Sequence, residues 1–307
     1  MNDHVKPALH GWLVLDKPRG LGSTQAVGMV KRLLREGGYA KTKVGHGGTL
    51  DPLAEGVLPI ALGEATKLAG RMLDASKIYD FTISFGEETS TLDIEGEVVA
   101  TSAVRPTLAE IEAVLGRFTG EIEQVPPAYS AIKVDGKRAY DRARAGEQVA
   151  LKTRPVTIHA LEMLSGEAGG PVTLTAHVSK GTYIRSLARD IALALGTRGH
   201  VTYLRRTKAG PFLEEQAISL DFPAQAGNGP PLHDLILPLE AGLDDIPALS
   251  LDPESAQAVR QGRVLSGMPQ SSGLYFAKLG NAPVALMEVT DGTAKVVRGF
   301  NLPDVAE

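Results

Sequence analysis

The pattern of apolar and polar positions predicts a chain that mixes strands and helices. Residues 12–15 form a short apolar run that ends in turn residues, which is typical of a buried strand. Residues 78–85 alternate apolar and polar side chains, so we expect a strand with one apolar face, on which Tyr79 lies. Residues 172–179 alternate in the same way, and residues 200–208 predict a further strand.

Helical periodicity marks three segments between these strands. Ser23 or Thr24 is expected to cap a helix whose apolar positions follow the helical period. Thr107 and Glu110 have the spacing of a capping box, which predicts a second helix. Residues 184–195 carry one apolar stripe and predict a third.

Two further segments complete the expected architecture. Residues 222–231 are rich in Gly, Pro and Ala and predict a surface loop. From about residue 249 a short helix at 253–261 precedes three strand-like runs, at 274–279, 284–289 and 294–297. This tail is long enough for a small β-rich appendage.

A stretch rich in glycine and proline, residues 45–59, separates the first predicted helix from the strand at 78–85. Its glycines indicate unusual backbone conformations or a close approach by another group. It holds His46 and Asp51, and Asp51 is followed by Pro52. An Asp-Pro pair is a good helix start, so Asp51 could simply be a helix cap. The alternative is a catalytic carboxylate presented on a stiff turn, and only its surroundings can decide.

Arg185 stands at an unusual place for a structural arginine. It falls in the first turn of the helix expected at 184–195, off the apolar stripe. The positive end of the helix dipole disfavours a cation there, so an anionic partner is expected. Arg205 and Arg206, taken alone, are expected to be surface charges.

The charge distribution suggests a partner that carries phosphates. The net charge is -4, but residues 131–208 hold 14 basic and 6 acidic side chains, and residues 1–50 hold 8 and 3. Residues 209–307 hold 5 and 13. The two basic segments could meet on one face and bind a phosphate backbone, or they could be ordinary solvated surface. Residues 124–154 interleave cations with tyrosines, as a nucleic-acid-contacting arm does, although a charged surface loop would also fit.

Composition excludes several classes of protein. The 307 residues suit one large domain with a small appendage, and 43% apolar residues indicate a globular chain. The absence of cysteine excludes disulfides and thiol catalysis and fits a cytoplasmic location. No signal peptide or membrane-spanning run is expected. The scattered histidines predict no metal site, and no phosphate-binding loop or nucleophile elbow is present.

A series of motifs, in order, resembles the bacterial tRNA pseudouridine-55 synthases of the TruB family. The stretch Gly45-His46-x-Gly48-Thr49-Leu50-Asp51-Pro52-Leu53-Ala54 is similar to the family's catalytic motif. The resemblance spans about residues 11–210, and the other matching segments are 15–18, 63–67, 77–79, 93–98, 124–131, 179–185 and 204–207. Two positions depart from the family pattern, Gly47 and Glu55, where Thr is frequent. Gly47 is expected to loosen the loop beside His46, and Glu55 to add a carboxylate near the site, altering kinetics without abolishing activity.

The resemblance implies a fold and a division into domains. We expect an α+β catalytic domain over residues 1–248, with a mixed, largely antiparallel central sheet, flanking helices and an RNA-contacting insertion at about 124–154. Residues 249–307 are expected to form a PUA-like C-terminal β domain.

The resemblance also implies an activity: isomerisation of uridine to pseudouridine at position 55 in the T-loop of tRNA, by base flipping and without guide RNA. The implied catalytic residues are Asp51, Tyr79 and Arg185, with Asp51 attacking the sugar or base, or taking a proton. Arg185 would hold Asp51 ionised, and His46 would fill the place of the flipped base. Lys17 would support the loop or a phosphate. The residues expected to bind substrate are His46, Lys17, Tyr183, Leu204, Lys133, Arg138 and Tyr129.

The implied enzyme needs no cofactor and no metal, because the reaction has no net redox change and adds no group. Its expected partner is tRNA, with no membrane and no obligate protein partner, and it is expected to act as a cytoplasmic monomer. Three alternatives remain open. They are a guide-RNA-dependent pseudouridine synthase, an RNA-binding, tRNA-folding module with incidental catalysis, and a carboxylate-based hydrolase.

Overall fold

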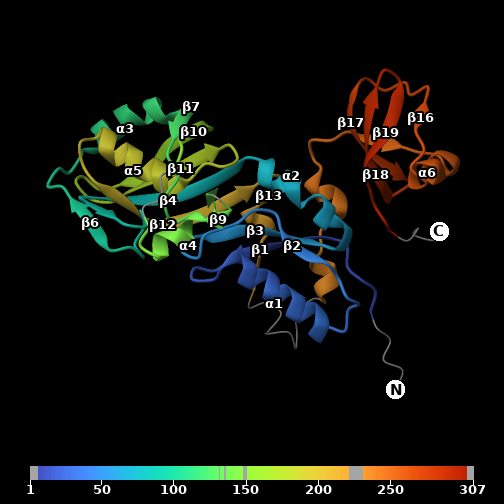
Figure 1. The fold of residues 1–307 in the computed structure, drawn as a ribbon, viewed down its shortest axis with the longest axis horizontal. Helices are drawn as coiled ribbons and strands as arrows, with labels where there is room; N and C mark the ends of the chain where they lie inside the picture. Colours follow the sequence, from blue (N-terminus) through green and yellow to red (C-terminus); the bar gives the residue numbers. More distant parts are fainter. Residues whose placement is uncertain (1–5, 131, 135, 148–150, 221–230, 303–307) are drawn as a thin grey trace.

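Two β-sheets of unequal size form the framework of the protein (Figure 1). The structure is a computed structural model that describes residues 6–130, 132–134, 136–147, 151–220 and 231–302. The surface loop expected at 222–231 lies almost wholly outside the described residues.

The main sheet has ten strands, and most of its pairings are antiparallel. Its path is β14-β1-β3-β12-β4-β11-β10-β7, with β2 paired to β3 and β13 paired to β12. Within the described part of this sheet, the β1–β14 and β3–β12 strand pairings are parallel and the others are antiparallel. The mixed, largely antiparallel sheet expected from the sequence is therefore confirmed. In chain order its strands are β1 (Gly11–Lys17), β2 (Val44–His46), β3 (Glu55–Leu62), β4 (Lys77–Phe85), β7 (Gly120–Gln124), β10 (Arg154–Gly166), β11 (Val172–Val178), β12 (Gly199–Ala209), β13 (Phe212–Leu213) and β14 (Ile218–Ser219).

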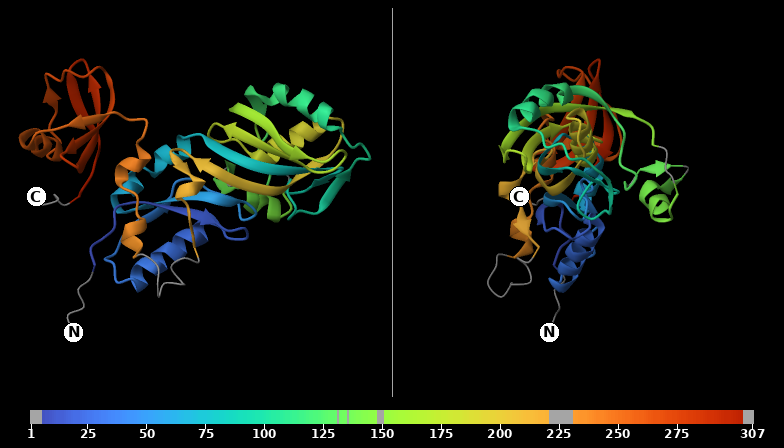
Figure 2. Two further views of the ribbon diagram at one scale, coloured as in Figure 1. Left: turned by 180° about the vertical axis from the view of Figure 1, so that it is seen from behind. Right: turned by 90° about the vertical axis from the view of Figure 1, so that its left-hand side faces the viewer.

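Helices cover this sheet on separate parts of its surface (Figures 1 and 2). Helices α3 and α5 pack on the half of the sheet that contains β4, β10 and β11, and α1 packs against β1 and β3. The helices are α1 (Ser23–Glu36), α2 (Ala69–Asp74), α3 (Leu108–Leu115), α4 (Ala139–Arg144) and α5 (Ile184–Ala194). Short 3-10 helices lie at Gly63–Lys67, Gly116–Phe118, Glu214–Gln216, Leu232–Leu235 and Leu239–Gly242. The capping box is confirmed, because the Thr107 hydroxyl accepts from the Glu110 amide and the Glu110 carboxylate accepts from the Thr107 amide.

Two small hairpins extend from the main sheet. Strands β5 (Glu87–Thr89) and β6 (Val98–Thr101) pair with each other. Strands β8 (Lys133–Val134) and β9 (Lys137–Arg138) form the second hairpin, which continues into α4. This second hairpin and α4 stand away from the main sheet in the side view of Figure 2.

The second sheet is built from the C-terminal part of the chain. Its order is β15-β17-β18-β19-β16, with bounds β15 (Ala248–Ser250), β16 (Leu265–Ser266), β17 (Gly273–Leu279), β18 (Ala282–Thr290) and β19 (Thr293–Gly299). Helix α6 (Pro253–Arg260) packs on it, capped by Asp252. The helix and the three strand-like runs predicted in this tail are confirmed. One apolar cluster joins the two sheets, since Phe276 and Phe300 pack with Trp12 and Phe212 of the main body.

One alternative left open by the sequence is excluded, and one local prediction was wrong. No helix follows Asp51-Pro52, because residues 51–54 are irregular and β3 begins at Glu55. The apolar run is instead a strand buried between β1, β2 and β12. The cap of α1 is Gly22, and Ser23 is the first helical residue. The hydroxyl of Ser23 is used elsewhere, in the loop that carries Asp51.

Candidate active site

The loop between β2 and β3 is held in place by side chains from distant parts of the chain. The Ser23 hydroxyl accepts from the Leu50 amide at 2.8 Å and donates to the Leu50 carbonyl at 2.9 Å. On the other side, the Gly20 amide donates to the Pro52 carbonyl at 2.7 Å. Asp51 lies between these two anchored residues, so its backbone position is fixed.

Two positions in and beside this loop require glycine for specific structural reasons. Gly48 has φ +137°, a conformation that side chains rarely adopt. Gly56 has φ +98°, and a Cβ there would lie 2.3 Å from the Arg206 carbonyl oxygen. Gly47 is different, because the limit is space: a Cβ would lie 2.8 Å from Met72 Cβ. Met72 therefore packs where a Thr side chain would stand, and it supports the loop.

Asp51 and Arg185 form the ion pair that the sequence predicted. Their Oδ2 and Nη2 atoms are 2.7 Å apart, with 38% of the Asp51 side chain exposed and 6% of Arg185. Arg185 also pairs with the buried Asp93 at 3.2 Å and donates to the Thr91 and Tyr129 carbonyls. A guanidinium with four polar contacts therefore orients one carboxylate that remains open to solvent.

The start of α5 shows why a cation is tolerated at the positive end of that helix. Two carboxylates, Asp51 and Asp93, face Arg185 and offset the unfavourable dipole. Arg185 therefore has two anionic partners, where the sequence predicted one. Asp93 was not singled out from the sequence, and the only signal for it was its place in the motif at 93–98.

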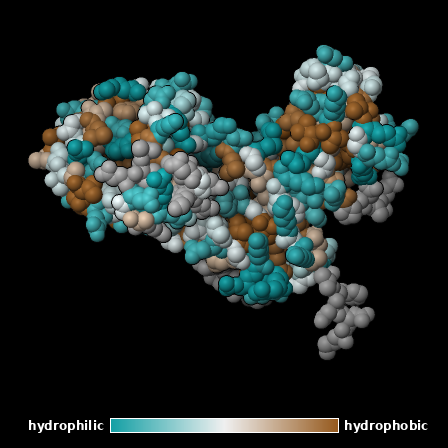
Figure 3. Space-filling model, viewed as in Figure 1, coloured by the Kyte–Doolittle hydropathy of each residue, from teal (hydrophilic) through white to brown (hydrophobic). Residues whose placement is uncertain are grey.

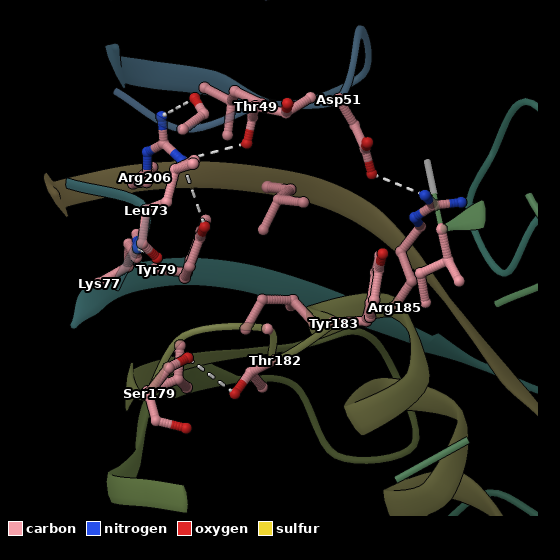
Figure 4. Close-up of a pocket in the computed structure, with 17 residues that line it drawn as sticks. Thr49, Asp51, Leu73, Lys77, Tyr79, Ser179, Thr182, Tyr183, Arg185 and Arg206 are labelled. Carbon is pink, nitrogen blue, oxygen red and sulfur yellow. Dashed lines mark hydrogen bonds and ion pairs between the residues drawn. The ribbon is translucent and has the colours of Figure 1, made fainter. Parts of the chain in front are cut away.

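A cavity of about 350 Å³ opens beside Asp51 (Figure 4). Tyr79 from β4, Leu204 and Arg206 from β12, and Tyr183 before α5 all line it. Lys77 also lines the cavity, and Ile132 contributes from the hairpin segment. The sequence-predicted residues Asp51, Tyr79, Arg185, Tyr183 and Leu204 thus share one cavity.

A second cavity of about 610 Å³ lies on the other side of the Asp51–Arg185 pair. His46 and Tyr129 line it, so these two residues do not line the cavity that contains Tyr79. His46 Nδ1 is buried without a hydrogen-bond partner among the described residues. Burial lowers the pKa of His46 and the charge of Arg206 lowers it further, so the ring is neutral at pH 7.

The insertion at 124–154 is attached to the N-terminal end of α5. The Gln124 side chain accepts from the Tyr183 amide at 2.8 Å and donates to the Tyr183 carbonyl at 3.2 Å. The Ser186 hydroxyl donates to the Val125 carbonyl at 2.7 Å. Lys133 and Arg138 lie opposite each other in the β8–β9 pairing, and their side chains are outside the described part of the structure.

Lys17 is fully buried beneath the loop. Its ammonium donates to the Pro18 and Leu21 carbonyls at 2.9 and 2.7 Å and lies 3.5 Å from the Pro52 carbonyl. Of the two roles left open by the sequence, loop support fits this position, since the side chain has no exposed surface for a phosphate.

Arg206 is not the surface charge that the sequence suggested. It is 1% exposed and donates to the Val57, Gly48 and Thr49 carbonyls, with the Tyr79 hydroxyl 3.5 Å away. The missed signal was strand alternation: Arg206 lies two residues after Leu204 and so shares its face of β12. Arg205 points to the opposite face.

The carboxylate of Glu55 pairs with the guanidinium of Arg205. Their charged groups are 3.5 Å apart, and Arg205 also pairs with Asp16 at 3.1 Å and Glu214 at 3.0 Å. The Glu55 carboxylate therefore has a cation beside it, which reduces its repulsion toward a phosphate.

Helix α1 carries several exposed basic residues. Hydrophilic side chains gather over α1 (Figure 3), whose exposed residues include Lys31, Arg32 and Arg35.

Among the described residues, no group of three His, Asp or Glu side chains could hold a metal ion. No helix within those same ranges is long and apolar enough to cross a membrane.

Comparison with known proteins finds similarity along nearly the whole chain. Residues 33–184 match the description "TruB family pseudouridylate synthase (N terminal domain)" and residues 185–244 match "tRNA pseudouridylate synthase B C-terminal domain". A tRNA pseudouridine synthase B of Novosphingobium aromaticivorans is 68% identical, over 97% of this chain and 99% of the relative. One from Zymomonas mobilis is 58% identical, over 96% and 97%.

Two solved structures share the fold of this chain. A structure described as an H/ACA RNP bound to a substrate RNA containing 2′-deoxyuridine has a TM-score of 0.71 and 27% identity, covering 96% of this chain and 86% of that one. An archaeal box H/ACA sRNP Nop10-Cbf5 complex has a TM-score of 0.69 and 27% identity, over 98% and 88%. The similarity to these chains includes both sheets.

Proposed function

The chain belongs to the TruB family of pseudouridylate synthases, and we propose that it converts uridine to pseudouridine at position 55 in the T-loop of tRNA, with Asp51 as the reacting carboxylate. The observation that carries the assignment of Asp51 is its geometry. It is a partly exposed carboxylate on an anchored loop, paired with Arg185 at 2.7 Å beside a cavity lined by Tyr79.

The chemistry requires one bond to break and another to form. The N1–C1′ bond of uridine breaks, the base turns, and C5 bonds to C1′ in its place. An ionised carboxylate can bond to the sugar, add to the base, or take a proton from the sugar, and Asp51 suits each route. Arg185 favours the ionised form and aims it, since its guanidinium also contacts Asp93 and two carbonyls.

The cavity wall suits a flipped pyrimidine. Tyr79 can stack on the base and can receive the C5 proton, directly or through water. Leu204 and Tyr183 supply apolar surface around the ring. A cavity of about 350 Å³ is of the size used for small ligands, which fits one extruded nucleobase.

The second cavity suits the RNA from which the base has left. A neutral His46 can fill the vacated place by stacking, at little desolvation cost because burial already disfavours its charged form. Tyr129 lines the same cavity, and Lys133 and Arg138 belong to the hairpin that follows it. We therefore assign the hairpin to the phosphate backbone of the T arm.

The remaining expectations belong to the same proposal. The reaction needs no cofactor or metal, and the enzyme works as a cytoplasmic monomer without an obligate protein partner. Residues 1–248 form the catalytic domain, and residues 249–307 form a PUA-like domain that contacts the tRNA outside its T arm. Residues 249–307 hold 5 basic and 6 acidic side chains, so no excess of positive charge supports a tight contact there.

Incubation of the purified protein with an unmodified tRNA transcript tests the proposal. Stand-alone conversion of uridine 55, mapped by pseudouridine-specific sequencing, is the expected result. Conversion only after addition of a guide RNA would instead assign the guide-dependent mode. Binding of tRNA without isomerisation would assign an RNA-folding role, and release of free uracil would assign a hydrolase.

A further inference from the structure

Two buried cations, Lys77 and Arg206, occupy one end of the cavity beside Asp51. Their exposed fractions are 7% and 1%. Figure 4 shows both beside Tyr79, at the end of the cavity away from the Asp51–Arg185 pair. In the described part of the chain neither forms an ion pair within 4.0 Å, although Arg185 at the other end has two carboxylates.

The hydrogen bonds of these cations do not use all their donors. The Lys77 ammonium donates to the Leu73 and Ala75 carbonyls at 2.8 and 2.6 Å, so one of its three N–H groups has no acceptor among the described residues. Arg206 has acceptors for four of its five N–H groups in the same ranges. Lys77 and Arg206 therefore each have one N–H group that can bind an anion.

Such an arrangement is costly unless an anion completes it. A buried charge without a counter-ion opposes folding, so a pair of them marks a functional requirement. Burial lowers the pKa of Lys77 to about 8, and Arg206 and Lys180 lower it while Asp74 raises it. At pH 7 the ammonium is still mostly charged. This end of the cavity therefore presents two buried positive charges.

The reaction supplies a matching anion. When the N1–C1′ bond breaks, its electron pair stays on the base, and the negative charge spreads over N1, O2 and O4. The positive charge at C1′ is taken up by Asp51, which bonds to it or removes the C2′ proton. After the base turns, the C5 electron pair bonds to C1′ while the Asp51–C1′ bond breaks or Asp51 returns the proton to C2′. The C5 proton then leaves and N1 gains a proton. The sum is an isomerisation with no other reactant.

We propose that Lys77 and Arg206 form an anion-stabilising end of the cavity that holds the detached uracil as its anion while it turns. This inference rests on the proposed function of the Asp51 site and adds a binding requirement to it. Fixed charges aimed at developing negative charge lower the barrier most where water is excluded. The two cations also keep the detached base from leaving, because the anion is bound more strongly than neutral uracil.

The test compares two leaving groups in one tRNA. Transcripts carry either uridine or 5-fluorouridine at the target position, and fluorine makes the detached base a more stable anion. Single-turnover loss of the N-glycoside is measured by nucleoside mass spectrometry. Lys77→Gln removes the charge while its amide can still donate to the helix carbonyls. It is expected to slow the uridine reaction by about 10²-fold and the 5-fluorouridine reaction by a clearly smaller factor.

Controls separate charge from packing. Lys77→Arg keeps the charge and is expected to recover most of the uridine rate, and Leu204→Ala, a packing change in the same cavity, is expected to slow both substrates equally. If Lys77→Gln fails to fold, Arg206→Gln provides the same comparison. Equal slowing of both substrates by a folded charge-removing variant would overturn the proposal. Inactivity of the unaltered enzyme on uridine would instead overturn the proposed function.

Discussion

At the scale of single residues, the site depends on side chains whose roles come from their neighbours. Asp51 is a carboxylate like many others until Ser23 fixes the loop and Arg185 meets it at 2.7 Å. The side chains of Lys17 and Arg206 are almost completely buried, and both donate hydrogen bonds to carbonyls around the same loop. The loop is therefore held largely by buried positive charge.

Gly47 and Met72 provide a residue-scale test of packing behind the loop. Gly47→Ala is expected to lower the free energy of unfolding by about 1–3 kcal/mol, because its Cβ would lie 2.8 Å from Met72 Cβ. Gly45→Ala is the matched control, since nothing lies within 4 Å of a Cβ there. Chemical denaturation measures both. In combination with Met72→Gly, which removes that Cβ, the cost of Gly47→Ala should shrink, and strict additivity of the two changes would contradict the contact.

The lowered pKa of Lys77 predicts how its contribution to stability depends on pH. Its pKa is about 8 in the folded state and 10.5 in the unfolded state, so between these values the unfolded chain binds more protons. Stability then rises with pH in that window. Below pH 8 the buried charge costs about 3 kcal/mol. The free energy of unfolding of the unaltered protein and of Lys77→Met is measured from pH 7 to 10. The unaltered protein should gain stability relative to the variant as the pH rises. A constant difference would contradict the buried ammonium.

At the scale of elements, the N-terminal end of α5 joins the catalytic pair to the insertion. Gln124 at the end of β7 is fully buried and bonds both backbone groups of Tyr183, the residue that caps α5. Ser186 and Arg189 of the same helix reach the Val125 carbonyl. The insertion therefore begins on the same rigid unit that aims Arg185.

Gln124→Leu tests this connection. It removes two hydrogen bonds and leaves buried backbone groups unpaired, so we expect a loss of about 2–3 kcal/mol in the free energy of unfolding. The rate of isomerisation should fall as well, because Arg185 lies two residues after Tyr183. Glu123→Leu, an exposed position of the same strand, serves as the control. A Gln124→Leu variant with unchanged stability and rate would show that the link is not needed.

The local sequence pattern predicted helices and strands better than it predicted the roles of individual side chains. The alternation at 78–85 and the capping box at Thr107 depend on neighbours in sequence, and both were correct. The Asp-Pro pair left a helix start open after Asp51, yet burial between β1 and β12 makes the following run a strand. Asp93 could not be paired with Arg185 beforehand, since that contact joins segments 92 residues apart. The burial of Arg206 was predictable from its spacing to Leu204.

At the scale of the whole molecule, an acidic protein presents basic segments around its site. The N-terminal 50 residues and residues 131–208 carry the excess of Lys and Arg, and the acidic excess lies in residues 209–307. An apolar cluster with Trp12, Phe276 and Phe300 joins the second sheet to the body. The second sheet lies at the end of the molecule away from β7 and α3 (Figure 1).

Salt dependence tests whether these basic segments meet the RNA. Binding of tRNA should weaken steeply as salt rises from about 50 to 200 mM, despite the net charge of -4, because each phosphate contact releases counterions. Filter binding over this range, with the logarithm of affinity plotted against that of salt concentration, gives the slope. An affinity that does not change with salt would remove the electrostatic part of the account.

The most direct test of the central claim is Asp51→Asn on unmodified tRNA. The amide keeps the size of the side chain and removes its charge, so the fold and tRNA binding should persist while pseudouridine formation falls by about 10³-fold or more. Single-turnover mapping of uridine 55, with binding measured on the same preparation, provides both values. Pseudouridine formation by the variant at a rate near that of the unaltered enzyme would contradict the role of Asp51.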